Sequence, residues 1–220
     1  VNGKGNRAIE NRCAVPQPHG GGGPGSGAVG CKNILKPFLP SPTVVGEEGA
    51  LRLEQDNPQS IGTVKAFYGN FLVVVRALTY LMTLGKEGVP EASSNAVLNC
   101  NYMMNHLKDV YDIAFDTGCM HEFVMTLANL KKEKGVSAMD VAKGLLDNGI
   151  HPPTMYFPLI VEPTETEPRE VLDHAIAVLH EIYQTAQSDP EKMHQMPLHT
   201  PVRRLDEVGA ARNPRLRFTF

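Results

Sequence analysis

A glycine-rich run near the start of the chain has the residue types that can hold an anion. His19 is followed by Gly20, Gly21, Gly22 and Gly23, and the run continues as Pro-Gly-Ser-Gly. Glycines let a backbone come close to a ligand with its amide N–H groups free to donate to an anion, and a histidine can donate a hydrogen bond or stack on a flat ring. The other interpretation is a flexible linker, although such linkers are rich in glycine and serine without flanking histidine and proline. These residues by themselves leave the two interpretations open.

Two nucleotide-binding motifs overlap this run, but neither fits its surroundings. Residues 25–30 match G-x-G-x-x-G, yet a glycine-rich segment rather than a strand precedes them, and Pro37 prevents a helix from opening after them. The same residues have the glycine spacing of a P-loop, but Cys31 stands where that motif requires lysine. A Rossmann or P-loop nucleotide site is therefore not expected.

The histidines, cysteines and carboxylates do not predict a metal site. His121 and His180 each precede a glutamate, but neither is followed four residues later by the second histidine that a zincin needs. The cysteines contain no C-x-x-C pair, so a zinc ribbon or a redox motif of that kind is not expected. They are Cys13, Cys31, Cys100 and Cys119. Four glutamates lie where a helix is expected to begin, and their interaction with the helix N-terminus explains them better than paired-carboxylate catalysis. They are Glu162, Glu165, Glu167 and Glu170.

The composition excludes several classes of protein. The 220 residues are 42% hydrophobic, 20% charged and 6% aromatic, as in a soluble globular chain of about one domain. A formal net charge of −3 provides no basic field for nucleic acid. The longest apolar stretch, residues 71–84, is shorter than the roughly 20 residues that span a bilayer, so we expect a buried helix and no membrane span. With no signal peptide in the first residues, a cytoplasmic location is expected.

The helices and strands that must position these residues can be predicted from the spacing of apolar residues and from the residues that begin and end such elements. Apolar steps of three and four predict a helix over residues 61–84, ended by Gly85, and a second helix from Pro90 to about Lys108. Residues 122–127 predict a short strand, and Ser137 with Asp140 predicts a capped helix that ends near Gly149.

The last part of the chain completes this pattern. Residues 155–161 predict a strand interrupted by Pro158, and a final helix begins near Pro168. This order of elements predicts an α+β fold with a small sheet covered by helices. The expected organisation is a poorly ordered lead-in (1–18), a glycine-rich loop with an irregular connection (19–60), a small α/β domain (61–192) and a basic C-terminal tail (193–220).

Many segments, in the same order along the chain, resemble the glycine decarboxylase family, the P-protein of the glycine cleavage system. They look like the C-terminal part of subunit 2 in the two-subunit bacterial and archaeal enzymes and extend over about residues 14–215. The segments are residues 19–27, 36–40, 60–62, 67–70, 98–102, 120–123, 140–143, 149–158, 162–167 and 200–206.

The resemblance implies the C-terminal small domain of a fold-type I pyridoxal-phosphate enzyme. Family members decarboxylate glycine and pass the aminomethyl group to the lipoyl arm of the H-protein, so subunit 1 and the H-protein are the implied partners. Within the chain, the resemblance puts His19 and the four glycines after it near the cofactor and substrate. His151 and Thr154, in a His-Pro-Pro-Thr run, are candidates for lining the same cleft, although the two prolines are also what a simple turn requires.

The sequence departs from the family pattern at the lysine that holds the cofactor. In relatives this lysine lies shortly before the glycine-rich run, but here Cys13 or Asn11 stands at the corresponding position, and Lys4 lies 15 residues before His19. We therefore expect a truncated family member without a catalytic residue of its own, without covalently attached cofactor and without independent activity. The alternatives are a non-catalytic interaction module that keeps the family's subunit-contacting surface as a homo- or hetero-oligomer, or a fragment.

Overall fold

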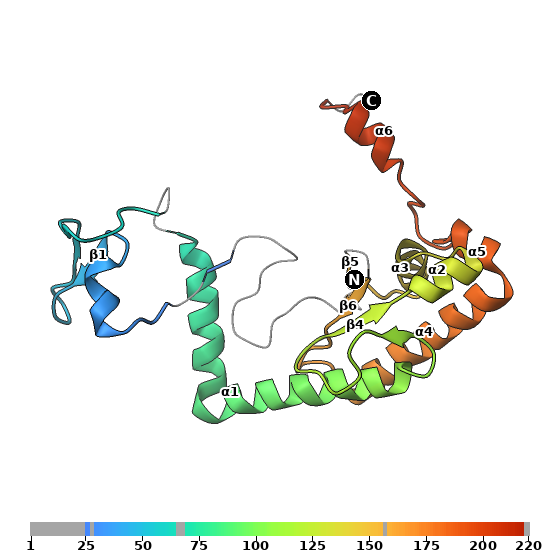
Figure 1. The fold of residues 1–220 in the computed structure, drawn as a ribbon, viewed down its shortest axis with the longest axis horizontal. Coiled ribbons are helices and arrows are strands. Elements are labelled where there is room, and N and C mark those ends of the chain that lie inside the picture. Colours follow the sequence, from blue (N-terminus) through green and yellow to red (C-terminus); the bar gives the residue numbers. More distant parts are fainter. Residues whose placement is uncertain (1–24, 27–28, 65–68, 156–157, 218–220) are drawn as a thin grey trace, which may run out of the picture. The chain divides into compact units, whose positions relative to one another are not determined.

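The computed structural model describes residues 25–26, 29–64, 69–155 and 158–217. The described residues divide into two compact units, one that ends at Thr83 and one that begins at Leu84. We call the described residues up to Thr83 the N-terminal unit and those from Leu84 onward the C-terminal unit (Figure 1).

The N-terminal unit consists mainly of short elements and connections. It contains a 3₁₀ helix, η1 (Asn33–Phe38), and an antiparallel hairpin of β1 (Thr43–Val45) and β2 (Arg52–Glu54). Gly46 makes the hairpin turn with a φ of 115°, and a Cβ there would lie 2.5 Å from the carbonyl oxygen of Ala50. This position therefore requires glycine, because a side chain would collide with backbone.

Helix α1 (Phe71–Leu107) begins in this unit and changes direction at a single glycine. Gly85 has a φ of 66° and a ψ of −168°, outside the helical region, and Pro90 follows it in the sequence. The break confirms that Gly85 separates two helical segments. The prediction that the first helix begins at residue 61 is wrong, because residues 61–64 are not helical and both Gly62 and Gly69 have positive φ.

The prediction that residues 71–84 form a buried helix is also wrong within the described unit. Leu72 and Met82 are each 74% exposed, and only Val73 and Ala77 in this segment are buried. Burial of a helix face requires a second apolar layer, which the described residues of the N-terminal unit do not provide. Among the described helices, none is both long and apolar enough to cross a membrane.

The C-terminal unit is built on a four-stranded antiparallel sheet in the order β3-β4-β6-β5. Its strands are β3 (Asp112–Ile113), β4 (Phe123–Thr126), β5 (Thr154–Met155) and β6 (Leu159–Val161). The strand predicted over residues 155–161 is in fact two paired strands, since Pro158 cannot donate to a ladder. The small sheet with its helices confirms the predicted α+β fold class.

The remaining helices of this unit follow local sequence signals. They are α2 (Ala128–Lys134), α3 (Ala138–Asp147), α4 (Arg169–Ser188), α5 (Pro190–Gln195) and α6 (Glu207–Arg212). The predicted capping box of α3 is confirmed, because the backbone N–H of Ser137 donates to Asp140 Oδ2 at 2.7 Å and Asp140 N–H donates to Ser137 Oγ at 3.4 Å. This reciprocal pair satisfies two of the unpaired donors at the helix start.

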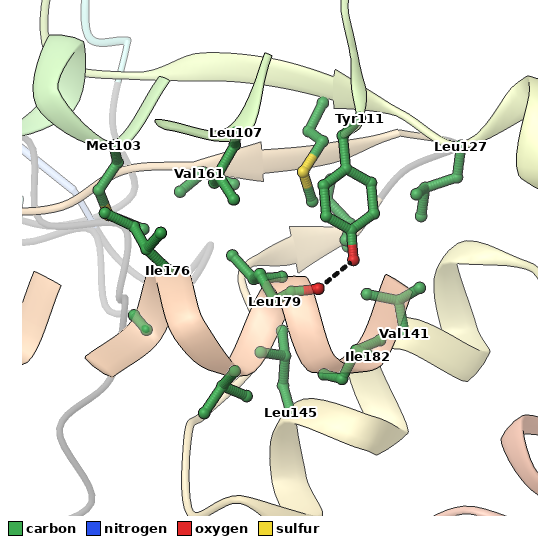
Figure 2. Packing of buried hydrophobic residues seen from close by; sticks show 14 of the residues in the cluster. Met103, Leu107, Tyr111, Leu127, Val141, Leu145, Val161, Ile176, Leu179 and Ile182 are labelled. Carbon is green, nitrogen blue, oxygen red and sulfur yellow. Dashed lines mark hydrogen bonds between the residues drawn. The ribbon is translucent and has the colours of Figure 1, made fainter. Parts of the chain in front are cut away.

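Apolar residues from the sheet and from helices α1 to α5 form one core in the C-terminal unit, part of which is drawn in Figure 2. Val161 of β6 and Leu107 of α1 lie on one side of α4, and Leu145 of α3 lies on the other. Tyr111 closes the core edge by donating its hydroxyl to the carbonyl oxygen of Leu179 at 2.8 Å. Full burial of an apolar side chain such as leucine or valine contributes roughly 1.5–3 kcal/mol, so this core supplies most of the unit's stability.

The segment expected as a basic tail begins inside the C-terminal unit. Met193 is fully buried, and Arg204 donates to Asp140 Oδ1 at 2.6 Å and to the carbonyl oxygen of Met196 at 2.8 Å. Asp147 accepts from the backbone N–H of His199 at 2.8 Å. The chain is thereby attached to α3 and α5 as far as Arg204, whereas the described residues after it are almost all exposed.

Candidate functional site

A polar cluster surrounds residues 98–102, in the second half of α1. We define the polar cluster by the residues of α1, of the loop before β4 and of the connection from β6 to α4 that contact one another there. Its members are Asn99, Cys100, Asn101, Cys119, His121, Glu162, Thr164 and Glu167. The cluster lies entirely within the C-terminal unit.

Asn99 fixes the connection between β6 and α4. Its side-chain amide donates to the carbonyl oxygens of Thr164 at 2.8 Å and Glu167 at 3.1 Å. Within the connection, the hydroxyls of Thr164 and Thr166 are 2.8 Å apart. One amide group thus pairs two backbone carbonyl oxygens of the connection and attaches the connection to α1.

Tyr102 ties the same stretch of α1 to α4. Its hydroxyl donates to Asp173 Oδ1 at 2.5 Å, and the guanidinium of Arg169 lies 5.9 Å from the centre of its ring. Arg169 also pairs with Asp173 at 3.6 Å, one helical turn later. These contacts lie at the exposed edge of the cluster and orient α4 relative to α1.

Glu162 has the most unusual environment in the cluster. It directly follows β6, is only 2% exposed, and its Oε1 accepts no hydrogen bond from the described residues. Burial raises the pKa of this carboxyl to about 7, with a further contribution from the negative charge of Glu122. His121 Nε2, 4.0 Å away, is the imidazole that faces it.

A buried carboxyl with a pKa of about 7 can hold or release a proton near neutral pH. A general acid or base works best when its pKa is close to the working pH, and Glu162 meets that condition. The neighbouring Glu167 has a second buried carboxylate oxygen, Oε2, without a hydrogen-bond partner among the described residues. Buried oxygens left unpaired in this way cost stability and often mark a functional site.

The interpretation of Glu162 as a helix N-terminal charge misses this environment. Glu162 lies seven positions before the first residue of α4, and its carboxyl faces the His121 side chain rather than the helix. The cysteine pair in the cluster was not expected either: the Sγ atoms of Cys100 and Cys119 are 3.1 Å apart, although the two residues are 19 positions apart in sequence. The available signal for this cluster was the run Asn99-Cys100-Asn101. The two amides hold the β6–α4 connection and the loop of Cys119 on either side of the Cys100 thiol.

The residues that the resemblance assigned to the cleft are not members of the polar cluster, and some fall outside the described residues. His19, Gly20, Gly21, Gly22 and Gly23 fall outside the described residues. His151 is exposed, with Nδ1 2.9 Å from the carbonyl oxygen of Pro152, and Thr154 begins β5 in register with Ile160. His151 thus precedes the edge strand β5, which Thr154 begins, and the role of both as cleft residues stays a prediction.

The described residues contain no buried lysine that could anchor pyridoxal phosphate. A site for this cofactor needs a lysine amine beside the cofactor, an acid for the ring nitrogen and a cradle of donors for the phosphate. None of the described lysines is buried. Nor do the described residues contain a group of three or more His, Cys, Asp or Glu side chains that could hold a metal ion.

Comparisons with known proteins agree on one family. A family model described as glycine dehydrogenase, C-terminal domain, matches residues 92–200, all within the C-terminal unit. A probable glycine dehydrogenase (decarboxylating) subunit 2 from Treponema denticola is 56% identical over 207 residues, which cover 91% of this chain and 43% of the relative. The protein of the same name from Caldanaerobacter subterraneus is 54% identical over 209 residues, with 92% and 43% covered. The chain thus spans less than half the length of the curated relatives it matches.

A solved structure supports the fold. The crystal structure of glycine decarboxylase (P-protein) of the glycine cleavage system, in inhibitor-bound form, matches with a TM-score of 0.52 and 20% sequence identity. The match covers 68% of this chain and 37% of that chain. The similarity agrees with the small α+β arrangement described above.

Proposed function

Because the chain belongs to the glycine dehydrogenase (decarboxylating) subunit 2 family, in its C-terminal region, we propose that it serves as the small domain of a glycine decarboxylase in the cytoplasm. In this role it helps an enzyme release the carboxylate of glycine as CO2 and pass the aminomethyl group to the lipoyl arm of an H-protein. The observation that carries the proposal is the 56% identity to the Treponema denticola protein over 91% of this chain.

The proposed cofactor is pyridoxal phosphate, held by residues other than those described. When bound, it supplies the electron sink that decarboxylation of an amino acid requires. The chain's own contribution is the fixed sheet and helices, together with a buried carboxyl whose pKa of about 7 lets it hold or release a proton at Glu162. We propose that a glycine decarboxylase subunit 1 is the partner chain.

A cofactor-trapping experiment tests whether these 220 residues attach the cofactor. The purified chain is incubated with pyridoxal phosphate, alone and with a subunit 1, and then reduced with borohydride before peptide mass analysis. We expect scattered, substoichiometric labelling of exposed lysines. Stoichiometric labelling of one lysine, such as Lys4 or Lys32, would overturn the proposal that the anchor is absent.

A chimera tests the proposed small-domain role directly. Residues 92–200, the part that matches the family model, replace the corresponding region of the Treponema denticola subunit 2. We expect the chimera to keep glycine decarboxylation, measured as exchange of the glycine carboxyl with labelled bicarbonate. A folded chimera that binds the cofactor but has no exchange activity would contradict the proposal.

A second proposal is a non-catalytic interaction module. The exposed apolar side chains of the N-terminal unit favour it, because they form a surface that the unit itself does not cover. The two proposals differ in the chimera, where a pure interaction module would support assembly with subunit 1 without restoring exchange.

A further inference from the structure

The thiols of Cys100 and Cys119 are positioned to close into a disulfide. Their Sγ atoms are 3.1 Å apart, and a disulfide requires about 2.05 Å, so the sulfurs have to approach by only about 1 Å. Small rotations of the two side chains can supply that movement. Both residues belong to the C-terminal unit, so the pair does not depend on how the two units are arranged.

Asn101 holds the loop that carries Cys119 in place. Its Nδ2 donates to the carbonyl oxygen of Cys119 at 2.7 Å, and the backbone N–H of Cys119 donates to Asn101 Oδ1 at 3.1 Å. The side-chain amide of Asn101, the residue that directly follows Cys100, thus fixes the loop on both sides of the Cys119 Cα. Because the two thiols are held together, each has a high effective concentration at the other, which favours their reaction.

The two thiols differ in their access to solvent. Cys100 is fully buried, whereas Cys119 is half-buried between two exposed residues, Gly118 and Met120. Burial, contact with Cys119 and the nearby carboxylates together raise the pKa of the Cys100 thiol. A reagent from solvent therefore meets Cys119 first, and Cys100 can react only with Cys119.

We propose that Cys100 and Cys119 are a reversible redox modification site that forms an intramolecular disulfide with a small-molecule disulfide, such as oxidised glutathione, as oxidant. The Cys119 thiolate attacks one sulfur of the oxidant, breaks its S–S bond and releases one glutathione. Cys100 Sγ then attacks Cys119 Sγ and breaks the mixed disulfide, and its proton passes to the second glutathione, which leaves as a thiol. The two protein thiols lose two electrons and two protons, and one glutathione disulfide becomes two glutathione thiols.

The disulfide joins α1 to the loop that leads into β4. It closes a segment of the chain between residues 19 positions apart, and so reduces the conformational freedom of the unfolded chain. The cross-link also lies on the loop that carries His121, which faces the buried carboxyl of Glu162. Oxidation thus stiffens the polar cluster.

The test uses the full chain with Cys13→Ser and Cys31→Ser, so that only the proposed pair can react. The protein is treated with oxidised glutathione, free thiols are alkylated, and disulfide-linked peptides are identified by mass. We expect one peptide pair linked through Cys100 and Cys119, no retained glutathione, and a Tm raised by roughly 5–10 °C that dithiothreitol reverses.

The matched control adds Cys119→Ser, which leaves the buried thiol in place. In this variant we expect no change of Tm on oxidation. Three results would overturn the proposal: both thiols still alkylated in the treated chain, glutathione retained on Cys119 as a stable mixed disulfide, or the same Tm shift in the control. The peptide analysis needs no variant at position 100 or 119, so it decides the outcome even if the control does not fold.

Discussion

The two units of the chain use their apolar residues in opposite ways. In the C-terminal unit, Leu107, Leu145 and Leu179 are at most 1% exposed and pack between the sheet and the helices. In the N-terminal unit, Leu72 and Met82 lie on the first part of α1, and each is 74% exposed. The described residues of that unit are held mainly by hydrogen bonds between connections, such as the one from Ser60 Oγ to the carbonyl oxygen of Leu39 at 2.6 Å.

This difference shows that an apolar helix does not make a core without a second layer. Helix α4 has the sheet on one side and α3 on the other, whereas residues 71–83 have neither among the described residues of their unit. The family model matches only residues within the C-terminal unit, the part that closes its own core. Four experiments can break or sharpen this comparison.

The largest expected effect comes from a pair of matched leucine truncations. Leu179→Ala removes a side chain that is 1% exposed in the core, and we expect it to lower the free energy of unfolding by about 2–5 kcal/mol. Leu78→Ala removes one that is 55% exposed in the N-terminal unit, and we expect a change below about 0.5 kcal/mol. Urea denaturation followed by circular dichroism measures both. Equal losses would mean that the two units do not differ in this way.

The next effect concerns the buried carboxyl of Glu162, which stabilises the C-terminal unit only when protonated. Its pKa rises from 4.5 to about 7 on folding, so its contribution is complete below pH 4.5 and is lost as the pH rises through 7. We therefore expect Glu162→Gln to be more stable than the unsubstituted chain by about 2–3 kcal/mol at pH 8 and nearly equal to it at pH 4. Urea denaturation at both pH values measures the difference.

The control is Glu181→Gln, an exposed position on α4. It should show no such dependence on pH. A destabilised Glu162→Gln variant at pH 8 would mean that the carboxylate has a partner that the described contacts do not include.

A smaller effect is expected where the chain attaches to α3 after the last long helix. Burial alone would raise the pKa of Asp140, but hydrogen bonds from Ser137 and Arg204 outweigh it and hold the pKa below the ordinary value of 3.8. We expect Arg204→Ala to cost about 2 kcal/mol at pH 7, because it removes the guanidinium from this buried carboxylate and leaves only the imidazole of His194, 3.5 Å from Asp140 Oδ1, as a partner of opposite charge. The cost should shrink as the pH falls below 3.8 and the carboxylate is protonated in both states.

The Tm values of Arg204→Ala and Arg212→Ala measure how much the contact of Arg204 with Asp140 stabilises the chain. Arg212, on the exposed helix α6, should change the Tm little. Similar losses in both variants would show that removal of a positive charge, rather than the contact with Asp140, determines the effect.

The smallest effect on stability is expected on the uncovered face of the N-terminal unit. Met82→Lys places a charge on a side chain that is 74% exposed, so we expect a change within about 0.5 kcal/mol. The same variant should bind less of a dye specific for apolar surface, because the exposed patch becomes smaller. A large loss of stability would mean that Met82 is covered in the folded chain.

The sequence was most informative where structure depends on neighbouring residues. The capping box of Ser137 and Asp140, the break at Gly85 and the interruption of a strand by Pro158 all follow from local backbone chemistry. The family also followed from the sequence, because many short segments matched in the correct order. The predicted start of α1 was wrong, because the helical spacing of apolar residues extends back to residue 61. Gly62 and Gly69 both take a positive φ, which is not helical.

The sequence by itself determined the elements, the α+β class and the family, because propensity, capping and motif order act between residues close in the chain. Only the tertiary structure decided that Glu162 is buried against His121 and that Cys100 meets Cys119 across 19 residues. It also decided which apolar faces are covered. Periodicity shows that a helix has an apolar face, but the burial of that face, and the pKa and reactivity that burial produces, depend on what packs against it.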